Sequence, residues 1–117
     1  MLENKIVLIV ESEILIALDL QRVLADIGVA QVVFARSCAE ALEAEVTTLG
    51  LAIIDAQPQN AEWITLVRRL ETAGIPSVVM TAQASLRAGV PGYETIPVLP
   101  KPFMERDLMA VLARTAR

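Results

Sequence analysis

Four side chains that follow short apolar runs could together act on a phosphoryl group. Asp55 closes one run and offers a carboxylate nucleophile, while Lys101, held between two prolines, offers an ammonium. Thr81 closes another run with a hydroxyl, and Glu11 follows the first run with a second acid. Phosphoryl transfer requires an oxygen nucleophile, a cation for the equatorial oxygens and an acidic ligand for Mg²⁺. These residue types therefore favour phosphoryl chemistry, provided that the fold brings the four side chains together.

The elements that must position them are five short apolar runs rich in β-branched residues. The runs span residues 5–10, 31–35, 51–55, 77–81 and 95–99. They do not alternate between polar and apolar side chains, which is typical of parallel strands covered by helices on both faces. Segments with helical spacing lie between the runs. This alternation predicts right-handed βαβ crossovers and one parallel sheet in a three-layer (βα)5 domain.

The helical segments have recognisable ends. We expect helices over residues 12–27, from 37 toward 50, over 60–74, and through 108–112 to the C-terminus. The predicted N-caps are Ser12, Ser37 and Asn60, and the predicted C-terminal stops are Gly28, Gly50 and Gly74. The apolar spacing of the first helix predicts a core face made of Leu15, Leu18, Val23, Leu24 and Ile27. Trp63 is expected to lie in the core.

The fourth connection differs from the others. Gly89, Pro91 and Gly92 leave at most residues 84–88 for a turn of helix, so this connection is predicted to be a loop. In doubly wound sheets, ligands bind beyond the carboxyl ends of the strands. The four chemical residues named above all fall at that predicted edge. The sequence therefore places a candidate site there.

The composition of the chain argues against several classes of function. The 117 residues suffice for one domain, and 55% of them are hydrophobic but only 3% aromatic. Histidine is absent, which removes imidazole-based acid/base catalysis and imidazole zinc sites, so we expect no classical enzyme. A net charge of −4 without a basic cluster predicts no nucleic-acid binding, and no apolar run is long enough to span a membrane. The single Cys38 favours a reduced, cytoplasmic location and is expected to be inert.

At this point the whole chain resembles the receiver domain of bacterial two-component response regulators. The resemblance rests on four segments in order, Val10-Glu11-Ser12-Glu13, Ile54-Asp55 with Pro58, Thr81-Ala82, and Lys101-Pro102-Phe103. It implies one domain over residues 1–117 with a flavodoxin-like or CheY-like doubly wound parallel sheet in the order 2-1-3-4-5. The fourth helix would be shortened or missing. The fourth connection and the residues around Lys101 are similar to single-domain receivers of alphaproteobacterial stress phosphorelays.

The resemblance also implies a role for each residue. Asp55 would accept a phosphoryl group from a histidine kinase or histidine phosphotransfer protein, and Lys101 and Thr81 would contact the phosphoryl oxygens. Mg²⁺ would be held by Glu11, Asp55 and the backbone carbonyl of Gln57. The phosphodonor would dock on the exposed side of the first helix and the loop after the fifth strand. An output protein would read the signal as altered affinity.

The chain departs from the receiver pattern at two further positions. Ser12 stands where receivers carry a second acidic residue, and Val98 stands where many carry an aromatic switch residue. A pseudo-receiver that binds proteins without being phosphorylated is therefore an alternative. A flavin or nucleotide binder of the same topology is a third hypothesis, but Glu11 and Glu13 would repel a phosphate after the first strand.

Overall fold

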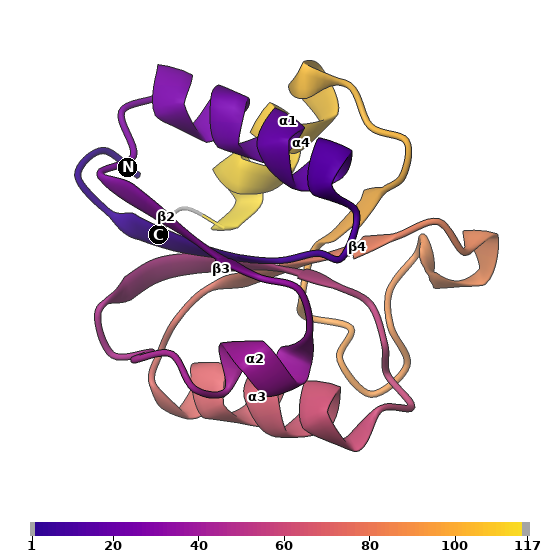
Figure 1. Cartoon of the computed structure of the whole chain (residues 1–117). Coiled ribbons are helices and arrows are strands. Elements are labelled where there is room, and N and C mark those ends of the chain that lie inside the picture. The colour runs from indigo at the N-terminus through magenta and orange to yellow at the C-terminus, as the bar shows by residue number, and fades with distance from the viewer. Residues whose placement is uncertain (1, 116–117) are drawn as a thin grey trace.

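The computed structural model describes residues 2–115, which form five parallel strands between two layers of helices (Figure 1). The strands are β1 (Ile6–Val10), β2 (Gln31–Ala35), β3 (Leu49–Asp55), β4 (Ser77–Thr81) and β5 (Val98–Pro100). Their order across the sheet is β2-β1-β3-β4-β5, and every neighbouring pair is parallel. The predicted three-layer architecture and strand order are confirmed.

The two faces of the sheet carry separate apolar cores because successive side chains of a strand point to opposite faces. Helices α1 (Ile14–Asp26) and α4 (Glu105–Thr115) cover one face, and α2 (Cys38–Ala41) and α3 (Ala61–Thr72) lie on the other (Figure 1). Ile9 and Ile53 pack in the core beneath α1 and α4, whereas Leu8 and Ile54 pack in the core with α3. Trp63 is fully buried in the second core, as expected.

Several predicted helix ends are confirmed by hydrogen bonds or backbone angles. The side chain of Asn60 accepts the N–H of Trp63 at 3.0 Å, and the Ser37 hydroxyl accepts the N–H of Glu40 at 3.1 Å. Gly28, with φ +90°, follows the end of α1, where a positive φ favours glycine. These local signals fix where three helices begin or end.

The second helix is shorter than predicted. It ends at Ala41 and does not run toward residue 50. The chain then enters three consecutive β-branched residues at 46–48, which disfavour helix, and the Glu45 carboxylate accepts both the N–H and the hydroxyl of Thr47. Gly50 is not a helix stop but part of β3. A Cβ there would lie 2.7 Å from the Cβ of Lys5, so glycine permits this close approach.

Two further boundaries differ from the prediction. The last strand covers residues 98–100 and not 95–99, because the N–H of Ile96 turns back to the carbonyl of Tyr93 at 3.0 Å. The first helix begins at Ile14 with Glu13 in the N-cap position, so the prediction that Ser12 is the N-cap was wrong. The N–H of Glu13 instead donates to the Glu11 carboxylate at 2.9 Å.

The core face of α1 was also partly mispredicted. Val23 and Leu24 are buried, but Leu15 is 78% exposed and Leu18 is 48% exposed. The buried stripe comprises Ala17, Leu20, Val23 and Leu24. The helix therefore presents this stripe to the sheet, and Leu15 and Leu18 lie outside it.

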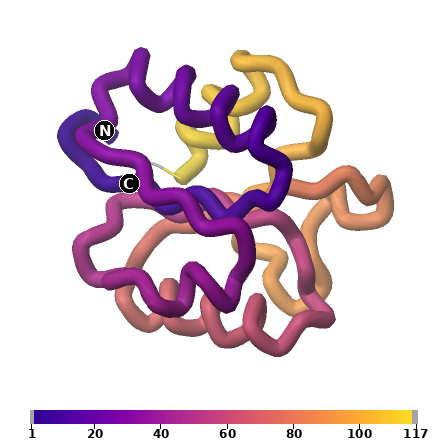
Figure 2. The backbone as a smooth tube through the Cα atoms, viewed as in Figure 1, coloured from indigo at the N-terminus to yellow at the C-terminus, as the bar shows by residue number. Residues whose placement is uncertain are grey.

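The fourth connection contains only the 3₁₀ turn η1 (Ala84–Leu86), so the predicted loss of a full helix is confirmed. Figure 2 shows the chain projecting at η1 and then returning beside α3 before it enters β5. Val90 is fully buried and Ile96 is 8% exposed. Together with Tyr93 they pack into the α3 core and cover the region that lacks a helix.

Candidate functional site at the carboxyl edge of the sheet

The four chemical residues meet at the carboxyl edge of the sheet, on the right of the view in Figure 1. Glu11 directly follows β1, Asp55 ends β3, Thr81 ends β4, and Lys101 directly follows β5. Strand pairing holds these ends in register. The N–H of Lys101 donates to the Thr81 carbonyl at 2.8 Å, which continues the β4–β5 ladder by one residue.

Lys101 lies between two carboxylates. Its Nζ is 2.8 Å from Oδ1 of Asp55 and 2.8 Å from Oε1 of Glu11. The Glu11 side chain is only 1% exposed and that of Lys101 is 11% exposed, whereas Asp55 is 27% exposed. The ammonium therefore neutralises a buried acid on one side, and on the other it contacts the carboxylate that solvent can reach.

The charges of this cluster shift its proton equilibria. Burial raises the pKa of the Asp55 carboxyl above its ordinary value, although the hydrogen bond and charge of Lys101 act in the opposite direction. Glu11 and Glu13 contribute to the rise by repulsion. Burial acts to lower the pKa of Lys101, but its hydrogen bonds to Asp55 and Glu11 outweigh burial, so that pKa is raised. Lys101 is therefore a firmly charged cation at neutral pH.

Thr81 and Glu11 are oriented by the backbone next to them. The Thr81 hydroxyl oxygen accepts the N–H of Gln83 at 3.0 Å, which leaves its own hydrogen free to donate. The second oxygen of Glu11 accepts the N–H of Glu13 at 2.9 Å. Both groups are buried, at 3% and 4% residue exposure. The site therefore has a fixed hydroxyl and a fixed buried acid beside the accessible Asp55.

The geometry shows how the predicted metal ligands lie relative to one another. Within residues 2–115, no group of three or more His, Cys, Asp and Glu side chains could hold a metal ion. Ser12 is exposed, and the carbonyl of Gln57 already accepts one hydrogen bond, from Asn60 at 2.9 Å. Glu11 and Asp55 nevertheless converge on one cation, the Lys101 ammonium. Two converging carboxylates fit Mg²⁺, which proteins usually hold through one or two carboxylates and the phosphate itself.

An apolar groove adjoins the site. Leu15, Leu18 and Arg22 of α1 line it on one side and Pro102 and Phe103 on the other, and its volume is about 490 Å³. Pro102 directly follows Lys101, so the groove begins next to the ammonium. The sequence analysis missed this surface because Leu15 and Leu18 were assigned to the core. Their spacing alone cannot show which side of the helix faces the sheet.

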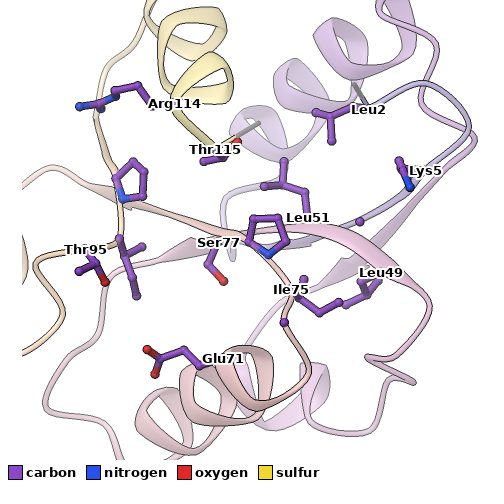
Figure 3. A pocket seen from close by; sticks show the side chains of 15 residues that line it. Leu2, Lys5, Leu49, Leu51, Glu71, Ile75, Ser77, Thr95, Arg114 and Thr115 are labelled. Carbon is purple, nitrogen blue, oxygen red and sulfur yellow. The ribbon is translucent and has the colours of Figure 1, made fainter. Parts of the chain in front are cut away.

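A larger cavity of about 930 Å³ lies at the opposite edge of the sheet (Figure 3). Lys5, Leu49 and Ser77, which lie at the starts of strands, help to line it. Glu71 and Arg114 extend the lining from two helices, and Figure 3 shows their side chains on different sides of the space. This cavity contains none of the four chemical residues. Its size therefore does not identify the functional site.

The fold is similar to that of response-regulator receiver domains. No protein-family model and no curated protein matches the chain. Among solved structures, SdrG from Pseudomonas melonis Fr1 in its BeF₃-activated conformation matches with a TM-score of 0.75 and 28% identity, over 97% of this chain and 98% of that one. The receiver resemblance inferred from the sequence is confirmed.

Two further neighbours support the fold assignment. The receiver domain of the PhyR response regulator from Erythrobacter litoralis has a TM-score of 0.71 and 24% identity, over 97% of this chain and 90% of that one. A signal receiver domain of an HD domain-containing protein from Pseudomonas fluorescens Pf-5 has a TM-score of 0.74 and 23% identity, over 97% of this chain and 94% of that one.

No helix within residues 2–115 is long and apolar enough to cross a membrane.

Proposed function

We propose that this chain is a receiver that takes a phosphoryl group on Asp55 from a phosphohistidine of a kinase or phosphotransfer protein. The observation that carries the proposal is the 2.8 Å contact between Lys101 Nζ and Asp55 Oδ1 at the accessible end of β3. It places a fixed positive charge beside the only cluster carboxylate that solvent can reach. The single domain over residues 1–117 is the unit that we propose to be modified.

In the proposed step, a carboxylate oxygen of Asp55 forms a bond to phosphorus as the donor's N–P bond breaks. The bonding pair stays on the imidazole nitrogen, and the product is an acyl phosphate. Lys101 neutralises charge on the phosphoryl oxygens, and the free hydroxyl hydrogen of Thr81 donates to one of them. The signal then passes to an output protein through altered affinity.

Glu11, Asp55 and the Gln57 carbonyl would hold Mg²⁺, with Ser12 in place of a stronger acidic ligand. When bound, the ion supplies charge neutralisation for the transferred group. Lys101 would then leave Glu11 and contact the phosphoryl oxygens. The resting ion pair with Glu11 keeps the ammonium at the site until that exchange.

The groove beside the site is proposed to receive the phosphodonor. It is continuous with Lys101 through Pro102, and Leu15, which lines it, is 78% exposed. Arg22 also lines the groove, where it pairs with Asp19 at 3.0 Å and lies 3.6 Å from Glu105. Charge reversal at Arg22 is expected to slow transfer from a cognate histidine protein but not from acetyl phosphate. Equal slowing with both donors would argue against docking.

The decisive experiment is intact mass after incubation with acetyl phosphate and Mg²⁺, with Asp55→Asn and metal-free samples in parallel. We expect a gain of one phosphoryl group that requires both Asp55 and Mg²⁺. No gain, under conditions that label an ordinary receiver, would contradict the proposal.

A second candidate function is a pseudo-receiver, favoured by the exposed, uncharged Ser12. Ser12→Asp separates the two functions. If the parent is not phosphorylated but Ser12→Asp is, the site of the parent is degenerate; a parent that is phosphorylated would exclude the pseudo-receiver.

The structural likeness to PhyR, which is a stress response regulator, is consistent with a place for this chain in a stress phosphorelay, provided that Asp55 is phosphorylated as proposed.

A further inference from the structure

One edge of the sheet lacks the features that usually keep an edge strand from pairing with another chain. Strand β2 forms this edge, and its five residues, Gln31–Ala35, include no charge, proline or glycine. The strand at the opposite edge, β5, has only three residues and ends in Pro100, which has no N–H to donate. Natural proteins protect edge strands with charges, prolines, bulges or short length. The β5 edge is protected in this way, whereas the β2 edge is not.

The backbone of β2 offers unpaired donors and acceptors along this edge. The Ala35 carbonyl accepts the N–H of Glu11 at 3.0 Å, so the backbone groups of Ala35 point toward β1. Successive residues of a strand direct these groups to alternate sides, so those of Val32 and Phe34 point away from β1. These outward groups have no hydrogen-bond partner within residues 2–115. Two N–H and two C=O groups are therefore available to a further strand.

The side chains of this edge are apolar and complement a second copy of themselves. Val32 packs against the core beneath α1 and α4, and Phe34 lies on the same face because it is in register with Ile9 of that core. Phe34 is nevertheless 39% exposed. In an antiparallel pair of two β2 strands centred on Val33, Val32 of each copy lies opposite Phe34 of the other. The pair would exchange backbone hydrogen bonds at these residues and form aromatic–β-branched contacts, which stabilise sheets.

The charges near the two ends of β2 favour the same antiparallel arrangement. Arg36 follows the strand, and its side chain is 85% exposed with Glu40 at 4.0 Å. Near the other end, Cγ of Glu3 lies 3.5 Å from the place that a Cβ of Gly28 would occupy. Antiparallel pairing brings the Arg36 end of one copy to the Glu3 end of the other. Parallel pairing would instead bring two Arg36 side chains together, which is unfavourable.

We propose that the β2 edge is a self-association surface, through which two copies of this chain pair antiparallel about a two-fold axis at Val33. The two five-stranded sheets then form one continuous sheet. The carboxyl edges of the two copies point in opposite directions, so each candidate phosphoryl site stays accessible. The groove beside that site lies between α1 and the loop after β5, at the far side of α1 from β2, and stays open. The pairing does not depend on phosphorylation of Asp55.

Sedimentation equilibrium of the whole chain tests the pairing. The surface is small, so association is measured at about 0.5 mM protein, where a weak dimer is populated. We expect the average mass of the parent to approach that of two chains. Phe34→Lys places a charge in the shared sheet and should have the mass of one chain. Met109→Lys is the matched control, because Met109 is also 39% exposed but lies on α4, and this variant should associate like the parent.

An engineered disulfide tests the register. The two copies of residue 33 would form a non-hydrogen-bonded pair with Cα atoms about 4.5 Å apart, which a disulfide can span. Residue 31 lies on the same face, but its two copies would be about 14 Å apart, which a disulfide cannot span. On oxidation, Val33→Cys should therefore form at least about tenfold more disulfide-linked dimer than Gln31→Cys. The parent, whose single Cys38 is buried, should form none.

The outcomes decide the proposal. A parent with the mass of one chain at this concentration overturns the pairing and leaves the edge to solvent or to an extended segment of another protein. A Phe34→Lys variant that still associates, with circular dichroism like that of the parent, places the contact on another face and also overturns it. Equal cross-linking at positions 33 and 31 overturns the register. Val33→Cys retains Phe34, so its cross-linking decides the proposal even where Phe34→Lys loses stability.

Discussion

Two leucines on α1 provide a matched test of how this helix lies on the sheet. Leu20 is 0% exposed, whereas Leu15 is 78% exposed, and both lie within Ile14–Asp26. Truncating a fully buried leucine to alanine costs about 2–5 kcal/mol, because the transfer free energy is lost and a cavity remains. The same truncation at an exposed position costs within about 0.5 kcal/mol. The two variants remove identical atoms, so their difference measures burial alone.

Urea unfolding followed by circular dichroism measures both variants. An m-value of roughly 1–3 kcal/mol per molar urea converts a loss of about 3 kcal/mol into a midpoint shift of about 1–3 M for Leu20→Ala. Leu15→Ala should unfold with the parent and, if the groove receives the phosphodonor, slow transfer from that protein alone. A loss above about 1 kcal/mol for Leu15→Ala would refute the orientation of α1 described above.

Three further predictions concern single residues. Asn60→Ala should lower the free energy of unfolding by about 1 kcal/mol, because the Trp63 N–H loses its cap, whereas Asn60→Asp should retain it in the same urea assay. The pKa of Cys38 is raised by burial to about 11, so native protein should react with Ellman's reagent about a hundredfold more slowly than urea-unfolded protein at pH 8, and a difference below about tenfold would contradict this. Asp55 has a raised pKa in the folded state, so the stability that it contributes is present below its ordinary value of 3.8 and is lost as the pH rises through the folded pKa. The stability of Asp55→Asn relative to the parent should therefore increase in thermal unfolding as the pH rises from below 3.8 toward neutrality, and a difference that stays constant would contradict the raised pKa.

The sequence was sufficient to predict the sheet and the edge at which the candidate residues lie together, because both depend on patterns within short segments. Continuous apolar runs identified all five strands, and the rule for parallel sheets placed Asp55 and Lys101 at one edge. The absence of a full fourth helix followed from Gly89, Pro91 and Gly92. Each of these inferences needed only the local preference of the chain.

The mispredicted features, which are the buried face of α1 and the residue at which it begins, depend on packing between elements and not on local sequence. The stripe that includes Leu15 and Leu18 is as apolar as the one that includes Leu20 and Leu24, and only the sheet determines which is buried. Ser12 is a favourable N-cap by type, but the buried Glu11 carboxylate bonds to the N–H of Glu13, and the helix begins one residue later than that cap requires. Contacts across elements, such as Trp63 with Tyr93, leave no local signal.

The proposed metal site has an exposed serine, Ser12, where a third carboxylate would strengthen binding of a divalent cation. Without a metal, Lys101 is the cation that Glu11 and Asp55 share, so the formal charges of the three groups sum to −1. If Mg²⁺ binds as proposed, it must displace the ammonium from Glu11, and Ser12 contributes no charge toward that exchange. Ser12→Asp adds the missing charge at an exposed position, where it costs the metal-free fold about 1 kcal/mol or less.

Thermal unfolding with and without Mg²⁺ tests this reasoning, with Ser12→Asn as the neutral control of matched size. A ligand present at its Kd stabilises the fold by about 0.4 kcal/mol, and at ten times its Kd by about 1.4 kcal/mol. We expect Ser12→Asp to gain at least 1 kcal/mol more from Mg²⁺ than the parent, roughly 3 °C or more in Tm, while Ser12→Asn gains no more than the parent. Equal Mg²⁺ shifts in the parent and Ser12→Asp would mean that position 12 lies outside the metal's reach, and that Glu11 and Asp55 alone determine the affinity.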